Sequence, residues 1–293
     1  MSRSAGCFVT MIGERWTAYW FVLPGTILLA AILGFPAIAS ILESFGLQGA
    51  AVPAGSYVAL LSDAQFLTAS FNTALFVVCV VTLHIVLGLA VALLLNSPIR
   101  YLWFFRVVAI LPWTVPDVIG GLIFRFMLDP LSGGVNALAI RLQLMQQPYD
   151  WLGNPDWAMF SVIMAETWRG YPYPMLILLA GLQAIPKEQY EAAAIDGAGA
   201  WATFTNVTLP SLMPMILIAV VLDVIWQCRL FGMIYGMTNG GPGDATQNLS
   251  LFVYRQYFQF FETSYAASAA VVLAAVLLTV AVPYIRATLR EKD

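Results

Sequence analysis

Six apolar segments, each long enough to cross a lipid bilayer as a helix, constrain this chain more than any other feature of its sequence. A bilayer core of roughly 30 Å needs about 20 mostly apolar residues in helical form. Inside lipid every backbone polar group must be satisfied within the protein, and an α-helix does this internally. We therefore predict an all-α polytopic membrane protein with six transmembrane helices, approximately over Thr17–Leu42, Phe71–Leu95, Val107–Leu128, Trp157–Leu182, Ser211–Phe231 and Tyr265–Ile285.

The composition excludes several classes of function. Of the 293 residues, 60% are hydrophobic and only 10% are charged, whereas a soluble domain has about 25% charged residues. The net charge is −3 and the basic residues form no block, so nucleic acid is not expected as a partner. Cys7, Cys79 and Cys228 are scattered and His84 is the only histidine, so neither a metal nor another cofactor is expected on this chain.

The positions of Lys and Arg outside the spans predict the orientation in the membrane. An even number of spans puts both termini on one side, and basic residues concentrate on the cytoplasmic side. Arg141 and Arg255 face the other side, whereas eight lie on the terminal side, namely Arg3, Arg15, Arg100, Arg106, Lys187, Arg286, Arg290 and Lys292. We therefore expect one transmembrane domain over 1–293, with a cytoplasmic N-terminus (1–16), a six-helix core (17–285) and a cytoplasmic tail (286–293).

The cytoplasmic segment 186–210, between the fourth and fifth spans, has the pattern of two short helices joined by a turn. Pro186 suits the first turn of a helix, and the stretch after it is rich in Ala and Glu, which favour helix. Gly197 stands where a left-handed residue commonly ends a helix. A second helix over about Ala200–Thr208 is expected to end before Pro210.

Two large aromatic side chains, Trp201 and Phe204, share one face of this second helix. Each such side chain buries about 150–250 Å² when it is covered, so leaving the face in water is unfavourable. From the residues alone, two kinds of surface could cover this face. One is the membrane interface, on which amphipathic helices lie, and the other is a partner protein.

The spacing within this segment resembles the EAA signature of ABC importer permeases. The sequence carries E-A-A at Glu191–Ala193, Gly197 after three residues and V-x-L-P from Val207 after nine more, with Val207 in place of Ile as the only departure. In that family the loop docks into a cleft on a cytoplasmic ATPase subunit. The resemblance implies ATPase-coupling roles for Glu191, Ala192, Ala193, Asp196, Gly197, Trp201 and Phe204.

The resemblance extends over nearly the whole chain and points to the carbohydrate-uptake, maltose-permease-like branch of this family. It is carried by FPAIASILESF, SFNTALFVV, ILPWTVPDVIGGLIFRFM, TWRGYPYPMLILLAGLQAIP and YGMTNGGPGDATQNLSLFVYRQYF. It implies a bacterial inner-membrane subunit with a homologous second permease, two copies of an ABC ATPase and an extracytoplasmic solute-binding protein. ATP and Mg would then bind the ATPase, and this chain would not be an enzyme.

Six charged residues inside the predicted third to fifth spans are candidates for a polar site, namely Asp117, Arg125, Glu166, Arg169, Asp223 and Arg229. A charge at a helix centre costs roughly 2.5–3.5 kcal/mol, whereas each Leu, Ile, Phe or Val returns about 0.3–0.6 kcal/mol. These groups are expected to face protein or a watery cavity, where Glu166 and Arg169 can pair. Ion pairs between helices explain Asp117, Arg125 and Arg229 equally well.

The fourth span contains Gly170, Pro172 and Pro174, which are expected to break its helix beside a cavity or a buried partner. Resemblance to the segment in which the maltose permease contacts its sugar implies substrate contacts at Thr167, Arg169, Gly170 and Tyr173, and in the fifth span at Asp223, Trp226 and Gln227. Whether Arg169 contacts an anionic substrate or only pairs with Glu166 stays open.

The predicted function is transport of a sugar or sugar derivative, such as an oligosaccharide, glycoside or polyol, by alternating access. An acidic sugar or glycerol derivative is an alternative substrate class, because Arg169 is suited to recognise an anion. An ATP-independent secondary transporter and a membrane enzyme are more distant alternatives. The outer loop Thr238–Asn248 is flexible by composition and is a candidate contact for the binding protein.

Overall fold

The computed structural model of the chain describes residues 19–46, 55–98 and 100–290, and the regular structure in these ranges is helical, with no strand. The N-terminal residues 1–18 and the last three residues of the predicted tail lie outside the described ranges. The first helix covers Tyr19–Ser44 and includes η1 (Ala30–Gly34) and α2 (Phe35–Ser44). It is followed by α3 (Gly55–Ser62), α4 (Ala64–Asn96), α5 (Leu102–Ile110), η2 (Leu111–Thr114), α6 (Asp117–Met127), α7 (Gly134–Arg141), α8 (Pro155–Gly170), α9 (Pro172–Ala184), α10 (Lys187–Ile195), α11 (Ala200–Thr203), η3 (Phe204–Thr208), α12 (Leu209–Cys228), α13 (Gly232–Met237), α14 (Leu249–Phe258) and α15 (Thr263–Arg290).

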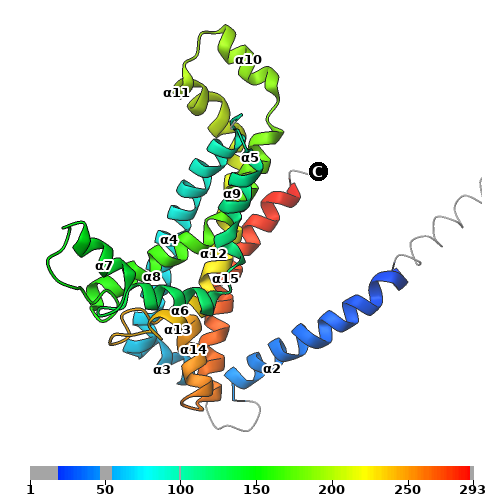
Figure 1. The fold of residues 1–293 in the computed structure, drawn as a ribbon. Helices are drawn as coiled ribbons and strands as arrows, with labels where there is room; N and C mark the ends of the chain where they lie inside the picture. The colour runs from blue at the N-terminus through cyan, green and yellow to red at the C-terminus, as the bar shows by residue number, and fades with distance from the viewer. Residues whose placement is uncertain (1–18, 47–54, 99, 291–293) are drawn as a thin grey trace, which may run out of the picture.

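Helices α4, α9, α12 and α15 form the centre of the molecule, where α4 packs against α9 and α12, and α12 also contacts α15 (Figure 1). Helices α10 and α11 lie beyond one end of this bundle, and α3, α13 and α14 lie toward the other (Figure 1). Apolar side chains of α4 belong to two separate buried clusters along the helix. Phe76 and Val80 belong to one buried cluster and Ala92 and Leu95 to a second, so that His84 falls between them along the helix.

Three of the described helices are long and apolar enough to cross a membrane: Tyr19–Ser44, Ala64–Asn96 and Ala200–Cys228. The predicted third span is not straight, because Leu102–Thr114 and Asp117–Met127 meet at an angle of 95°. Val115 is extended at the bend, as expected of a residue that precedes proline, here Pro116. The fourth and sixth predicted spans each overlap a shorter apolar helix, Pro172–Ala184 and Thr263–Thr279.

The fourth span breaks where the sequence predicts, since α8 ends at Gly170 and α9 begins at Pro172. Neither Pro172 nor Pro174 has a backbone N–H, so neither can donate to the carbonyl group four residues earlier. The single residue Tyr171 joins the two helices. The break therefore lies inside the helical core, between α4 and α12.

The prediction that the second coupling helix ends before Pro210 is wrong. One continuous helix runs from Ala200 to Cys228, made up of α11, the π-helical η3 and α12. Pro210 lies in the first turn of α12, directly after η3. Proline is tolerated there because the wider π-helical turn changes the local hydrogen-bonding pattern.

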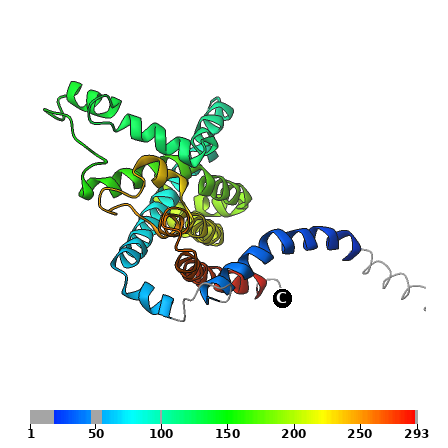
Figure 2. The same cartoon turned by 90° about the horizontal axis from the view of Figure 1, so that it is seen from below.

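The first helix, Tyr19–Ser44, projects from the bundle (Figures 1 and 2), and none of its most apolar 18-residue window is buried. Its α2 part packs against α15. The aliphatic and aromatic side chains along it, such as Trp20 and Phe35, are about 70% exposed. In a membrane this surface is covered by lipid or by another apolar helix.

The loop Thr238–Asn248 is tied to the helices around it, which does not fit the flexibility expected from its composition. The Asn72 side chain donates to the backbone oxygens of Asp244 (3.0 Å) and Gln247 (3.1 Å). The Arg255 guanidinium donates to the Asp244 carboxylate at 3.0 Å and also to the Gln247 side chain. These partners come from α4 and α14, so the composition of the loop alone could not predict that the loop is held in place.

Candidate functional site

One pocket gathers six of the seven residues that the sequence singled out for substrate contact. It is lined by Trp113, Arg169, Gly170, Tyr173, Asp223, Trp226 and Gln227. It encloses about 10 Å³, close to the space that one water molecule needs. The break between α8 and α9 places the end of one helix and the start of the next against α12. The pocket is therefore built from three helices and the short turn η2, which supplies Trp113.

Thr167 is the one predicted contact that the structure does not bring into this pocket. Its hydroxyl donates to the backbone oxygen of Ile163 at 2.7 Å, inside its own helix, and its side chain is buried. Trp113 is the pocket residue that the sequence analysis missed. Its only signal in the sequence is an aromatic residue three positions before Pro116, at the bend of the third span.

Three aromatic rings lie in a row along the pocket. The rings of Trp113 and Tyr173 are stacked, with centroids 6.0 Å apart, and the rings of Tyr173 and Trp226 are 6.2 Å apart at 32°. About 40% of each tryptophan is exposed. Flat apolar rings beside hydrogen-bonding side chains are the surface that binds a polyhydroxylated ring.

Arg169 is held by two carboxylates. Its Nε and NH2 groups donate to the two carboxylate oxygens of Glu166, at 2.9 and 2.6 Å, and its NH1 group lies 2.9 Å from Asp117 Oδ1. Arg169 and Glu166 are almost fully buried, whereas Asp117 is 36% exposed. Because bidentate pairs compensate the cost of burying charge, the guanidinium is neutralised inside the protein in this conformation.

A second group of hydrogen-bonded polar side chains lies behind the pocket. The His84 ring contacts the Asp223 carboxylate at 2.9 Å, and the Gln227 amide nitrogen donates to the other oxygen of that carboxylate at 3.1 Å. All three side chains are at most 2% exposed. The Gln227 Oε1 atom is buried without a hydrogen-bond partner, which is costly for a polar group.

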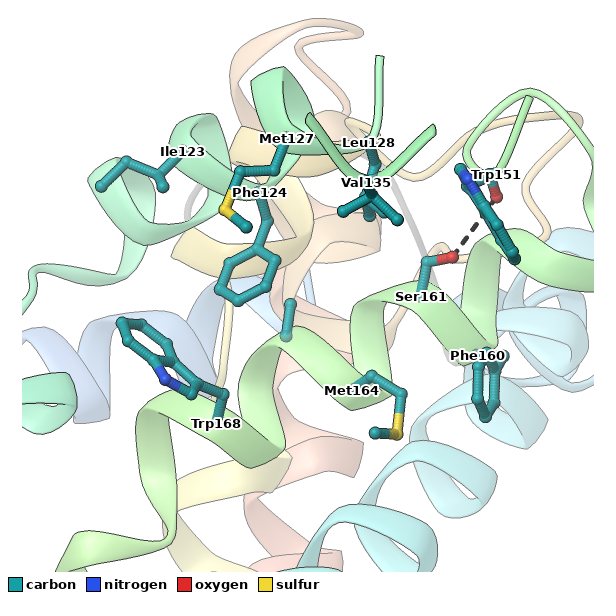
Figure 3. Close-up of a pocket in the computed structure, with 11 residues that line it drawn as sticks. Ile123, Phe124, Met127, Leu128, Val135, Trp151, Phe160, Ser161, Met164 and Trp168 are labelled. Atoms are coloured by element: carbon teal, nitrogen blue, oxygen red, sulfur yellow. Dashed lines mark hydrogen bonds between the residues drawn. The ribbon is translucent and has the colours of Figure 1, made fainter. Parts of the chain in front are cut away.

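A larger cavity, about 520 Å³, lies elsewhere, between α6 and α8 (Figure 3). Phe124 and Trp168 form its end wall with ring centroids 5.5 Å apart, and Ser161 already donates to the Trp151 backbone oxygen. No charged side chain lines it. A polar solute needs convergent hydrogen-bonding groups, so this cavity is a poorer candidate for a sugar site than the smaller pocket.

The predicted coupling segment is a helical hairpin at one end of the molecule (Figure 1). Gly197 adopts φ +75° at the turn, a conformation that favours glycine. Ile195 and Trp201 are 85% and 76% exposed, and the Trp201 and Phe204 rings lie 5.8 Å apart. Ile195 and Trp201 are thus largely uncovered within the described part of the chain, whereas Phe204 is partly buried.

A groove of about 470 Å³ runs between the two helices of the hairpin. It is lined by small and polar residues, namely Gln189, Ala192, Ala193, Asp196, Ala198, Ala202, Asn206, Val207 and Ser211. Three of the predicted coupling residues, Ala192, Ala193 and Asp196, belong to this lining. Glu191 lies on the exposed surface of α10 instead.

Buried charged and polar groups at a broken helix inside an apolar core are typical of membrane transport proteins, because such groups are rare in membranes and mark functional sites such as solute pathways. Comparison with known proteins narrows this class to one family. The chain belongs to the binding-protein-dependent transport system inner membrane components, whose family model matches residues 84–291. It is therefore a permease subunit of a transport system of this kind.

Relatives with described functions support this assignment. The chain is 32% identical over 289 residues to the sulfoquinovosyl glycerol transport system permease protein SmoG of Agrobacterium fabrum, covering 96% of this chain and 93% of the relative. It is 38% identical over 202 residues to the trehalose/maltose transport system permease protein MalF of Thermococcus litoralis, covering 69% and 68%.

A solved structure confirms the predicted all-α membrane fold. It is the crystal structure of a bacterial ABC transporter involved in the import of the acidic polysaccharide alginate, and one of its chains matches with a TM-score of 0.81 at 23% identity. The match covers 98% of this chain and 99% of that chain. The overall arrangement of the helices is thus one already observed in a solved structure.

Proposed function

We propose that this chain forms half of the translocation pathway of an ATP-driven, binding-protein-dependent importer for a sugar or sugar derivative, and that it works by alternating access. The observation that carries the proposal is that three aromatic rings line one pocket together with Arg169, Asp223 and Gln227. The relatives named for trehalose, maltose and sulfoquinovosyl glycerol support the substrate class. An oligosaccharide, a glycoside or a polyol fits this chemistry.

The size of the pocket supports a second, homologous permease subunit. Sites for small molecules usually enclose about 300–1,000 Å³, whereas the pocket in this chain encloses about 10 Å³. A facing pocket on a homologous partner would complete the site. The wholly exposed window of the first helix, which needs an apolar cover from lipid or protein, is consistent with such an assembly.

The exposed hairpin supports ATP hydrolysis on separate subunits. We propose that two copies of a cytoplasmic ABC ATPase bind ATP and Mg, and that one copy covers Trp201 and Ile195 of this chain. The segment 186–210 then acts as the coupling loop, with Glu191 facing a basic group of the ATPase. This chain carries no ATPase activity of its own in the proposal.

The same assignment orients the chain in the bacterial inner membrane. With the hairpin in the cytoplasm, both termini are cytoplasmic, and the loops around α7 and α14 face outward. An extracytoplasmic solute-binding protein delivers the substrate there, with Thr238–Asn248 as a contact. A solved relative of this fold supports this arrangement, since it was crystallised with a periplasmic protein that carries an alginate pentasaccharide.

An acidic sugar or glycerol derivative is the second candidate substrate, and Arg169 is the observation that favours it. The guanidinium lines the pocket, and Asp117, its half-exposed partner, is the carboxylate that an anionic group of the substrate would replace. The relative named for sulfoquinovosyl glycerol agrees with this possibility. Competition between neutral and acidic sugars for uptake separates the two candidates.

Uptake by the complete importer in proteoliposomes tests the proposal. The assembly purified through a tag on this chain is supplied with ATP, binding protein and radiolabelled trehalose, maltose or sulfoquinovosyl glycerol. We expect uptake of a sugar-type solute that stops when ATP is withheld. Uptake without ATP, or purification without an ATPase subunit, would instead support a secondary transporter.

A further inference from the structure

His84 connects the two helices that carry most of the pocket, although it does not line the pocket itself. Its Nδ1 atom lies 2.9 Å from Asp223 Oδ2 in α12, and its Nε2 atom lies 3.1 Å from the backbone oxygen of Glu166 in α8. The ring lies so close to Gly170 that a Cβ there would come within 2.2 Å of His84 Cε1. The side chain is completely buried.

Both hydrogen-bond partners of this ring are acceptors. A backbone carbonyl oxygen can only accept, and an ionised carboxylate can only accept, whereas a neutral imidazole has one N–H group and one bare nitrogen. With one ring proton, a bare nitrogen would face an acceptor oxygen at one of the two contacts. Both contacts of His84 are satisfied only when Nε2 carries a proton and a second proton lies between Nδ1 and Asp223 Oδ2.

The surroundings favour the second proton on the ring rather than on the carboxylate. Imidazole is intrinsically a much stronger base than a carboxylate. The other oxygen of Asp223 accepts a hydrogen bond from the Gln227 amide and so carries no proton. The Nε2 atom of the ring faces a backbone carbonyl oxygen in the last turns of α8.

We propose that His84 is a positioning residue, held as a doubly protonated imidazolium, that orients Asp223 and through it the amide of Gln227. With His84 charged, its positive charge and that of Arg169 balance Glu166 and Asp223 within the buried network. Asp117 then remains as the half-exposed carboxylate at its edge. The balance explains how five ionisable groups share one apolar core.

The proposal also determines which atom of Gln227 donates and which accepts a hydrogen bond. Its consequence for the substrate rests on the proposed function. Because both oxygens of Asp223 act as acceptors, the Gln227 side chain must present its NH2 group to Asp223. Its Oε1 atom is thereby left as an acceptor without a partner in a residue that lines the pocket. Because Oε1 is buried in this conformation, a hydrogen-bond donor of the ligand, which in a sugar is a hydroxyl group, would reach it on opening of the pocket.

Nitrogen NMR of the imidazole tests the proposal directly, because this chain has a single histidine. The full chain, purified with a histidine-free tag, is labelled with ¹⁵N-histidine and placed in lipid nanodiscs at neutral pH. We expect two ring nitrogens that each carry a directly bonded proton, and the loss of both signals in His84→Asn assigns them. A ring with one bare nitrogen would overturn the proposal.

Two carboxylate variants provide matched controls on the same signals. Asp223→Asn removes the counterion of the ring and is expected to leave only one protonated nitrogen. Asp117→Asn removes a carboxylate that bonds Arg169 but not the ring, and is expected to leave both protons in place. Two protons in Asp223→Asn would contradict the proposed pairing. No transported solute is needed, so a failure here leaves the proposed transport function untouched.

Discussion

At the scale of single residues, Arg169 shows how this membrane core accommodates charge. The guanidinium uses three of its nitrogen groups on the carboxylates of Glu166 and Asp117. Two of these bonds go to a fully buried partner and one to a partner at the pocket edge. Removal of the Glu166 carboxylate is therefore expected to lower the free energy of unfolding more than removal of the Asp117 carboxylate.

We expect Glu166→Gln to lower the free energy of unfolding by about 3–5 kcal/mol, because it leaves the buried Arg169 without its bidentate partner. Asp117→Asn is expected to lower the free energy of unfolding by clearly less, since water reaches Asp117 and can replace the lost contact. Denaturant unfolding of both purified variants in detergent checks the difference. Equal losses would show that Glu166 is not the main partner of Arg169.

We expect Gly170→Ala to disrupt the site by pushing the His84 ring out of place. The new methyl group would lie about 2.2 Å from the ring, and overpacking of this kind typically costs about 1–3 kcal/mol. ATP-dependent uptake is therefore expected to fall together with thermal stability. Gly134→Ala is the control, since nothing lies within 4 Å of a Cβ at that position and neither quantity should change.

Most of the pocket residues were predicted from the resemblance to the maltose permease, and local signals in the sequence predicted the helix break and the buried charges among them. Gly170 and the two following prolines mark a helix break, and charges in an apolar span mark a polar interior. Trp113 and His84 were not predicted as parts of the site. Their roles depend on which helices lie beside one another, and neither periodicity nor composition contains that information.

At the scale of elements, the coupling hairpin is tied to the core at the start of the fifth span. Tyr190 and Thr208 share a hydrogen bond of 3.3 Å, and Ser211 donates to the Gln189 side chain at 3.2 Å. Both contacts join α10 to the continuous helix that begins at Ala200. A force applied to the hairpin is thereby passed directly to that helix.

We expect Trp201→Ala to reduce the amount of ATPase that copurifies with this chain, without loss of the folded permease. The side chain is 76% exposed, so its removal takes little from the fold but removes an aromatic surface for a partner. Phe260→Ala, an exposed aromatic residue near α14 at the other end of the molecule, is the matched control. Equal ATPase recovery from the wild type and both variants would argue against docking at Trp201.

The bends of the elements were harder to predict than their existence. All six apolar segments contain described helices, but the 95° bend of the third and the continuity of Ala200–Cys228 were missed. In both places proline misled the prediction. Pro116 was placed inside a straight helix, and Pro210 was taken as a stop although a π-helical turn accommodates it.

At the scale of the whole molecule, the two ends of the bundle differ in character. One end carries the hairpin with Ile195, and the other carries α14 and the connection to α15 with Phe260 (Figure 1). The orientation proposed above puts these two exposed positions on opposite sides of the membrane. Each position is thus suited to a test of topology.

A membrane-impermeant maleimide reports this topology. In a background without Cys7, Cys79 and Cys228, Ile195→Cys is expected to react only in inside-out vesicles. Phe260→Cys is expected to react only in cells with an intact inner membrane whose outer layers have been permeabilised. The opposite pattern would place the hairpin outside and remove the basis for coupling to a cytoplasmic ATPase.

The unbroken helix from Ala200 to Cys228 has a mechanical consequence. Trp201 lies near its first turn and Trp226 near its last, and at 1.5 Å per residue they are separated by about 38 Å along the axis. If this rod pivots as a rigid lever about Trp201, a tilt of about 5° sweeps Trp226 through about 3 Å, roughly the length of a hydrogen bond. A small rocking movement at the motor end would then be enough to release a sugar hydroxyl at the far end.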